Sequence, residues 1–255
     1  MTSSIYHLLR TLFFLIPMIT FYSIVAGIVT PISSLWDHAG RFGNTVMRIW
    51  CWLVLATTGV RVEVSGLDRL VPGATYVFVS NHQSMYDIPV IFRWLPYQLR
   101  VIAKQSLGSV PFVGWHLRRT GHVLVNRGRP DRSGILRQWR RLVEQHLSLV
   151  IFPEGTRSAD GRVAPFKAGS FLLAIEAGLP VVPLSVAGSR FVMRKGELTT
   201  RPGFAQLTIH APIDTRDGTW SPTPDDARRL AAQAQQVVGE AVERIERERS
   251  PWPSR

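Results

Sequence analysis

The chain has 255 residues, of which 45% are hydrophobic and 19% are charged. This composition indicates a folded domain of roughly 200 residues plus an appendage, and it excludes an intrinsically disordered chain. The single cysteine, Cys51, excludes an internal disulfide framework and a cysteine-based zinc site; its apolar neighbours indicate a small buried hydrophobic residue.

The net charge of +12 requires an anionic partner, which could be nucleic acid, an anionic lipid surface or a phosphorylated substrate. Residues 118–141 hold eight arginines and one acid, Asp131. Arg137, Arg140 and Arg141 are typical of a solvated helix face. No nucleic-acid-binding motif is recognised, and the apolar N-terminus favours a bilayer over nucleic acid.

Residues 1–59 are predicted to form a membrane anchor of two apolar helices. The apolar run 12–29 would be about 27 Å long as a helix, the lower limit for crossing a bilayer. The second run, 46–59, is too short to span, so the pair predicts a helical hairpin buried in one leaflet, with a single span as the alternative. Pro17 and Pro31 are expected to kink or end the first helix.

A cleaved secretory signal is another interpretation of this N-terminus, with cleavage near residues 25–27. The second apolar run would then be an unusual start for a mature protein, which favours the anchor.

Beyond residue 59, short β-rich runs alternate with helical ones. Strands are predicted at residues 61–66, 75–80, 99–104, 121–126, 147–153, 180–186 and 204–213. Helices are predicted at residues 88–95, 110–119, 132–146, 169–178 with Gly178 as its C-cap, and 225–249, which is long and amphipathic. This alternation implies an α/β fold with a mainly parallel sheet covered by helices on both faces.

The stretch SNHQSMYDIP, residues 80–89, joins a predicted strand to a predicted helix. Asp87 is expected to cap that helix, which leaves a turn at the carboxyl end of the strand, where α/β sheets bind ligands. On one helix, residues five apart would point about 140° apart, but across a turn Asp87 can reach back to His82. Either Asp87 fixes one imidazole nitrogen and leaves the other free to take a proton, or His82 is an ordinary turn residue.

A second polar segment directly follows the strand predicted at 147–153. It supplies a carboxylate, a glycine that lets backbone approach a ligand, a hydroxyl and a guanidinium suited to bidentate phosphate binding: Glu154, Gly155, Thr156 and Arg157. Lys104 and Arg127 end two further predicted strands. Four strand ends that each deliver a polar or cationic residue indicate a binding rim rather than chance turn composition.

Four blocks of the sequence resemble those of the glycerolipid acyltransferases. NHQSMYD (81–87) resembles the first block, H-x-x-x-x-D, and FPEGTRS (152–158) matches the third. GHVLVNR (121–127) and LPVVPLSV (179–186) resemble the second and fourth, in the family's order. The resemblance covers residues 60 to 215 and is strongest to the bacterial 1-acyl-sn-glycerol-3-phosphate acyltransferases. One departure is Asn126, where an acid is common, which concerns the finer acceptor preference.

The resemblance implies that residues 60–255 are an acyltransferase catalytic domain ending in an amphipathic helix. An acyl group would move from acyl-CoA or acyl-carrier protein to the sn-2 hydroxyl of lysophosphatidic acid, giving phosphatidic acid. His82 would be the general base and Asp87 its orienting partner. A thioester is already activated, so no serine or cysteine nucleophile is required, and the chain has no G-x-S-x-G elbow. No metal and no resident cofactor are implied.

The resemblance also implies binding roles. Six residues would hold the glycerol phosphate: Lys104, Arg127, Glu154, Gly155, Thr156 and Arg157. Glu154 is expected to contact an arginine or the glycerol hydroxyl, since an unpaired carboxylate would repel phosphate. Val182 and Pro183 would line the acyl channel, with a plain core strand as the alternative.

The implied partners are membrane lipids, lysophosphatidic acid and the thioester donor, and the implied location is the cytoplasmic face of the cell inner membrane. Three alternatives stay open: another lyso-lipid acceptor such as a lyso-aminolipid, a lipid hydrolase, and a non-catalytic basic module on anionic membrane.

Overall fold

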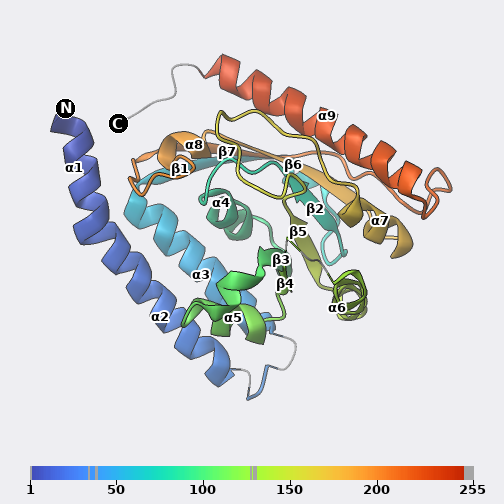
Figure 1. Cartoon of the computed structure of the whole chain (residues 1–255), viewed down its shortest axis with the longest axis horizontal. Coiled ribbons are helices and arrows are strands. Elements are labelled where there is room, and N and C mark those ends of the chain that lie inside the picture. Colours follow the sequence, from blue (N-terminus) through green and yellow to red (C-terminus); the bar gives the residue numbers. More distant parts are fainter. Residues whose placement is uncertain (1, 34, 38–39, 127, 129–130, 250–255) are drawn as a thin grey trace.

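The computed structural model describes residues 2–33, 35–37, 40–126, 128 and 131–249. Within them the chain folds into a seven-stranded sheet with helices on both faces (Figure 1). Arg127, the predicted cation at the end of the fourth strand, lies outside the described residues.

The sheet has the spatial order β1-β7-β6-β2-β5-β3-β4. Its strands are β1 (Val60–Ser65), β2 (Val77–Ser80), β3 (Leu99–Lys104), β4 (Val123–Val125), β5 (Ser148–Ile151), β6 (Val181–Ala187) and β7 (Gly203–Ile209). All neighbours pair in parallel except β6 and β7, which confirms the mainly parallel sheet. The carboxyl ends of β2, β5 and β3 therefore meet at one edge.

Helices follow most strands, as predicted, except that the short helix between β6 and β7 was not predicted. They are α4 (Asp87–Trp94), α5 (Val113–Arg119), α6 (Arg132–Glu144), α7 (Gly169–Glu176), α8 (Ser189–Val192) and α9 (Pro224–Glu248), with short 3₁₀ turns η2 (Leu67–Arg69) and η3 (Gln105–Ser109). The C-cap of α7 is Ala177, and Gly178 follows it with a φ of 59°, so the predicted cap at Gly178 is wrong by one residue.

Two hydrophobic cores lie on opposite faces of the sheet. Phe78, Val150 and Val182 point into the core beneath α3 and α4, whereas their neighbours Val77 and Leu149 point into the core beneath α7 and α9. This alternation is the two-residue period of a strand buried on both faces, and it explains why these strands read as continuous apolar runs.

The N-terminal segment forms a helical hairpin. α1 (Thr2–Arg10), a π-helical turn η1 (Thr11–Leu15) and α2 (Ile16–Ser33) make one long rod beside α3 (Arg41–Thr58), as Figure 1 shows. Within it, residues Ile5–Ser33 are long and apolar enough, by length and composition, to cross a bilayer.

Pro17 and Pro31 were expected to kink or end the first helix, and neither of them ends it. The Ile16 N–H bonds to the Thr11 carbonyl five residues back, a π-type bond directly before Pro17. A wider turn at this place relieves the clash between a proline ring and the carbonyl four residues earlier. Pro31 lies inside the last turn of α2, which ends two residues later.

The hairpin packs closely on the rest of the protein. A Cβ added to Gly27 of α2 would lie 2.5 Å from the Cβ of Phe112, so only glycine allows α2 to approach the start of α5 this closely. Cys51 of α3 is fully buried in the first core, which confirms its reading as a small hydrophobic residue.

Candidate active site

The turn after β2 is fixed to the neighbouring strand β6 by one side chain. Asn81 Nδ2 donates to the Val186 carbonyl, and the Val186 N–H donates to Asn81 Oδ1, each at 2.8 Å. The amide therefore continues the sheet pairing where the β2 backbone turns away, and it sets the starting point of the turn that carries His82.

His82 and Asp87 are in direct contact across this turn. His82 Nδ1 lies 2.7 Å from Asp87 Oδ2, and the same oxygen accepts from the backbone N–H groups of Gln83 at 2.7 Å and Ser84 at 2.9 Å. Because a carboxylate with these donors acts as an acceptor, Nδ1 carries the hydrogen and Nε2 keeps a lone pair in the neutral ring. The pair has the arrangement of an oriented base.

The expected capping role of Asp87 is wrong. Asp87 is the first residue of α4, Tyr86 is the N-cap, and no side-chain hydrogen bond caps this helix. The carboxylate instead turns back to the amides that precede the helix, because the tight turn at 82–86 brings those N–H groups to it.

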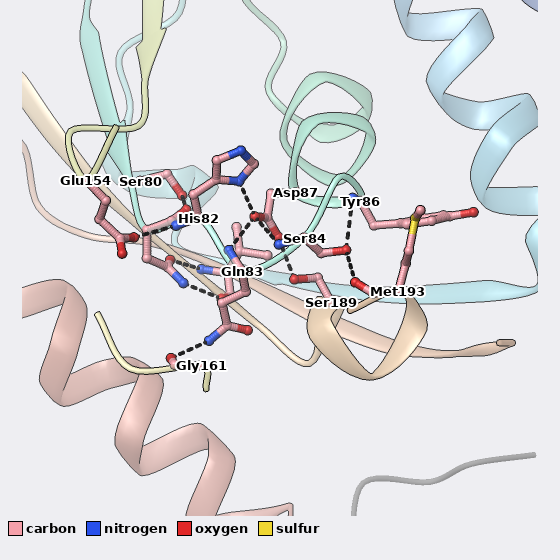
Figure 2. A network of polar contacts seen from close by, with 12 residues as sticks. Ser80, His82, Gln83, Ser84, Tyr86, Asp87, Glu154, Gly161, Ser189 and Met193 are labelled. Carbon is pink, nitrogen blue, oxygen red and sulfur yellow. Dashed lines mark hydrogen bonds and ion pairs between the residues drawn. The ribbon is translucent and has the colours of Figure 1, made fainter. Parts of the chain in front are cut away.

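The imidazole is held but accessible at one end. Its ring stacks on Phe152, with centroids 4.1 Å apart and planes 25° apart, and 11% of the side chain is exposed whereas Asp87 is fully buried. No hydrogen bond between described residues reaches Nε2, and Figure 2 shows this nitrogen on the side of the ring away from Asp87. A substrate hydroxyl could therefore approach Nε2.

The segment after β5 holds the backbone of His82 from both sides. The His82 N–H donates to Glu154 Oε1 at 2.6 Å, and the Ser158 N–H donates to the His82 carbonyl at 2.7 Å. The first and third sequence blocks thus meet in one hydrogen-bonded unit (Figure 2).

The expected contact of Glu154 with an arginine is wrong within the described part of the chain. Its second oxygen, Oε2, accepts from the Ala164 N–H at 3.0 Å, so backbone amides occupy both oxygens. Burial raises the pKa of Glu154, and the hydrogen bonds from the Ala164 and His82 amides oppose that rise. The side chain is 5% exposed and acts as a buried support for the turn.

The other predicted phosphate-binding residues lie around this unit. Gly155, Thr156 and Arg157 follow Glu154 in the same loop, with Thr156 exposed and Arg157 half-buried. Lys104 is exposed at the end of β3, which pairs with β5. The structure brings His82, Asp87 and Glu154 into contact, whereas Lys104 shares only the sheet edge with them.

Val182 and Pro183 do not line one channel. Val182 lies fully buried in the core beneath α3 and α4. Pro183 lies on the other face, beside a groove of about 690 Å³ that also contacts Arg69 and His210. Adjacent residues of a strand point to opposite faces, which is why the two side chains separate.

Two functional candidates were not predicted from the sequence. Lys167 places Nζ 2.7 Å from the position a Cβ would occupy on Gly155, so a cation lies over the loop that carries Arg157. Ser189 donates to Asp87 Oδ1 at 2.5 Å from the start of α8. Neither has a local sequence signal, because each reaches the site through the fold.

The fold and the paired side chains define an α/β protein with an oriented imidazole at the carboxyl edge of a mainly parallel sheet. The chain belongs to the acyltransferase family, whose family model matches residues 61–187. This confirms the resemblance read from the four blocks.

Known relatives and a solved structure agree with this membership. The chain is 32% identical to a 1-acyl-sn-glycerol-3-phosphate acyltransferase of Chlamydomonas reinhardtii, over 84% of this chain and 63% of that protein. It is 35% identical to the mouse 1-acyl-sn-glycerol-3-phosphate acyltransferase alpha, over 68% and 60%. The chain thus spans about three fifths of the length of these relatives. The crystal structure of the 1-acyl-sn-glycerophosphate acyltransferase PlsC from Thermotoga maritima matches with a TM-score of 0.81 and 28% identity, over 95% of this chain and 97% of that one.

Proposed function

We propose that this protein transfers a fatty acyl group from an acyl thioester to the sn-2 hydroxyl of lysophosphatidic acid, giving phosphatidic acid. The observation that carries the proposal is the His82–Asp87 pair, with Nδ1 bound to a buried carboxylate and Nε2 open to a substrate. The names of the relatives, all 1-acyl-sn-glycerol-3-phosphate acyltransferases, support this acceptor.

The reaction needs one proton carrier and one activated carbonyl. His82 Nε2 takes the proton of the acceptor hydroxyl as the oxygen attacks the thioester carbonyl carbon. The carbon–sulfur bond then breaks, and the leaving thiolate takes the proton from the imidazolium. The products are a new ester and a free thiol, and the imidazole is neutral again. Asp87 stabilises the transient imidazolium and keeps Nε2 aimed at the hydroxyl.

Cations around the 152–158 loop would hold the acceptor phosphate. Arg157 offers a planar fork that matches two phosphate oxygens. Lys167, over Gly155, adds a second positive charge to the same loop. Lys104, exposed at the end of β3, is a further candidate, and Arg127 is a candidate from the sequence alone. Glu154 would not repel the phosphate strongly, because both of its oxygens face backbone amides.

Residues 1–59 would anchor the enzyme in the cytoplasmic leaflet of the inner membrane, with residues 60–255 as the catalytic domain. Large apolar side chains are exposed on the α1–α2 rod, on α3 and around η3 and α5; they include Phe13, Phe21, Trp52, Leu107 and Trp115. An exposed surface of this kind fits a lipid environment better than water. A one-tailed acceptor lies in the same leaflet, and the thioester donor reaches it from the cytoplasm.

Thiol release from palmitoyl-CoA by the detergent-purified full chain, with and without lysophosphatidic acid, tests the proposal, with the lipid product identified by mass. Release should depend on the acceptor, yield phosphatidic acid, and fall roughly 10²- to 10⁴-fold in His82→Ala. A matched control is His146→Asn at the opposite edge of the sheet, where the residue is exposed and its φ of 55° suits asparagine.

Two outcomes would overturn the proposal. Release that needs no acceptor would indicate a thioesterase. If the protein releases thiol neither from palmitoyl-CoA nor from palmitoyl-carrier protein, an acyl thioester is not its donor.

A further inference from the structure

The two oxygens of the Asp87 carboxylate have different partners. Oδ2 accepts from His82 Nδ1 and from two backbone amides, whereas Oδ1 accepts from the Ser189 hydroxyl at 2.5 Å. Asp87 and Ser189 are both fully buried. Ser189 therefore supplies the only side-chain hydrogen bond to Oδ1 among the described residues.

The fold brings Ser189 to this place from a distant part of the chain. β6 ends at Ala187, and Gly188, with a φ of 84°, turns the chain so that α8 begins at Ser189. This left-handed conformation favours glycine, since a side chain there would be strained. Figure 2 shows α8 beside the turn that carries His82, with the Ser189 hydroxyl pointing at Asp87.

We propose that Ser189 is a positioning residue of the acyl-transfer site, which sets the rotation of the Asp87 carboxylate and through it the direction and basicity of His82. This inference rests on the proposed function. Without the Ser189 hydroxyl, Oδ1 would be a fully buried carboxylate oxygen with no side-chain donor among the described residues. The carboxylate would then gain by rotating about its Cβ–Cγ bond towards another donor, which would weaken the contact between Oδ2 and His82 Nδ1. The hydroxyl also shares the negative charge of Asp87, so its loss would strengthen the attraction between the carboxylate and an imidazolium.

Ser84 offers a matched control for a purely structural effect. Its hydroxyl is also fully buried and donates to the Met193 carbonyl just after α8, at 2.7 Å. Ser84 and Ser189 thus tie the same short helix to the same turn, but only the Ser189 side chain bonds to Asp87. Ser84→Ala removes a similar tether without removing a donor from the carboxylate.

Two readouts test the inference, one with turnover and one without. The pH dependence of kcat/KM is measured with palmitoyl-CoA and lysophosphatidic acid for the wild type, Ser189→Ala, Ser189→Thr and Ser84→Ala. The titration of the His82 ring nitrogens is followed by nitrogen-15 NMR in the same proteins, with His82→Ala identifying the signal. Thermal unfolding reports the loss of stability in each variant.

Ser189→Ala should lower kcat roughly tenfold, the effect of one hydrogen bond to a charged group. It should also move the His82 titration and the acidic limb of the rate profile to higher pH, and Ser189→Thr should restore both. Ser84→Ala should lower the unfolding temperature comparably with no shift of either midpoint.

An unchanged His82 titration in Ser189→Ala, or the same shift in Ser84→Ala, would overturn the inference. Because the NMR titration needs no turnover, it still decides the role of Ser189 if the acyl-transfer reaction itself is not found.

Discussion

Replacing Glu154 with glutamine tests whether His82 depends on the segment after β5. The carboxylate accepts one hydrogen bond on each oxygen, from the His82 and Ala164 amides. Glutamine has the same shape but only one oxygen, so its NH₂ group must face one of these N–H donors. Leaving a buried donor unpaired costs about 1–3 kcal/mol.

The effect on catalysis follows from this cost. If the unpaired donor is the His82 N–H, the turn is destabilised at the residue that is proposed to be the base. At about 1.4 kcal/mol per tenfold change in rate, this cost corresponds to a roughly 5- to 150-fold lower kcat. Stability should fall by less than the same amount, because glutamine also removes a buried charge whose pKa burial raises.

The assay compares kcat and thermal unfolding of Glu154→Gln with those of Glu176→Gln, which makes the same charge change at an exposed position of α7. Wild-type kcat in Glu154→Gln, at unchanged unfolding temperature, would refute the argument that both oxygens are needed.

Three further predictions concern recognition, backbone strain and pH. Arg157→Lys should raise the KM for lysophosphatidic acid while leaving the fold intact, because an ammonium cannot copy a two-pronged contact; Arg162→Lys, in an exposed side chain of the same region, should have no effect on this KM. Gly155→Ala should cost about 1–2 kcal/mol of stability and reduce activity, since the φ of 76° is strained for alanine and the added Cβ would lie 2.7 Å from Lys167 Nζ; an unchanged unfolding temperature would contradict this. Burial lowers the pKa of His116 to about 4, and unfolding restores its ordinary value of 6.5. Between these two values only the unfolded state binds the proton, so the stability of the fold should decrease as the pH drops from 6.5 towards 4. Unfolding temperatures measured across this pH range should decrease towards pH 4, and the decrease should be smaller in His116→Gln. If the variant shows the same pH dependence as the wild type, the effect belongs to other groups than His116.

Most helices and strands could be predicted from the sequence, because the spacing of apolar residues that defines them lies within a single segment. The alternating run at 61–66 and the apolar runs at 75–80 and 147–153 all lie on observed strands. The antiparallel pairing of β6 with β7 was not predictable in this way, because side-chain alternation does not encode strand direction.

The site was predictable where its chemistry lies within one turn. The spacing of His82 and Asp87 allowed a contact, and the structure has it at 2.7 Å. The arginine partner of Glu154 was predicted wrongly, because a buried carboxylate can be satisfied by backbone amides that carry no sequence signal. Ser189 was missed because 102 positions separate it from Asp87, and only the path of β6 and α8 joins them.

The two hydrogen bonds that hold the His82 backbone restrict how substrates enter. Glu154 and Ser158 belong to one segment, so lifting that segment from the sheet would break both bonds at once and release the base from its position. If residues 152–158 moved as a lid, each opening would therefore break the two hydrogen bonds that position His82. If the proposed reaction depends on this position of His82, substrates enter and leave by a route that keeps residues 152–158, Arg157 among them, against the sheet.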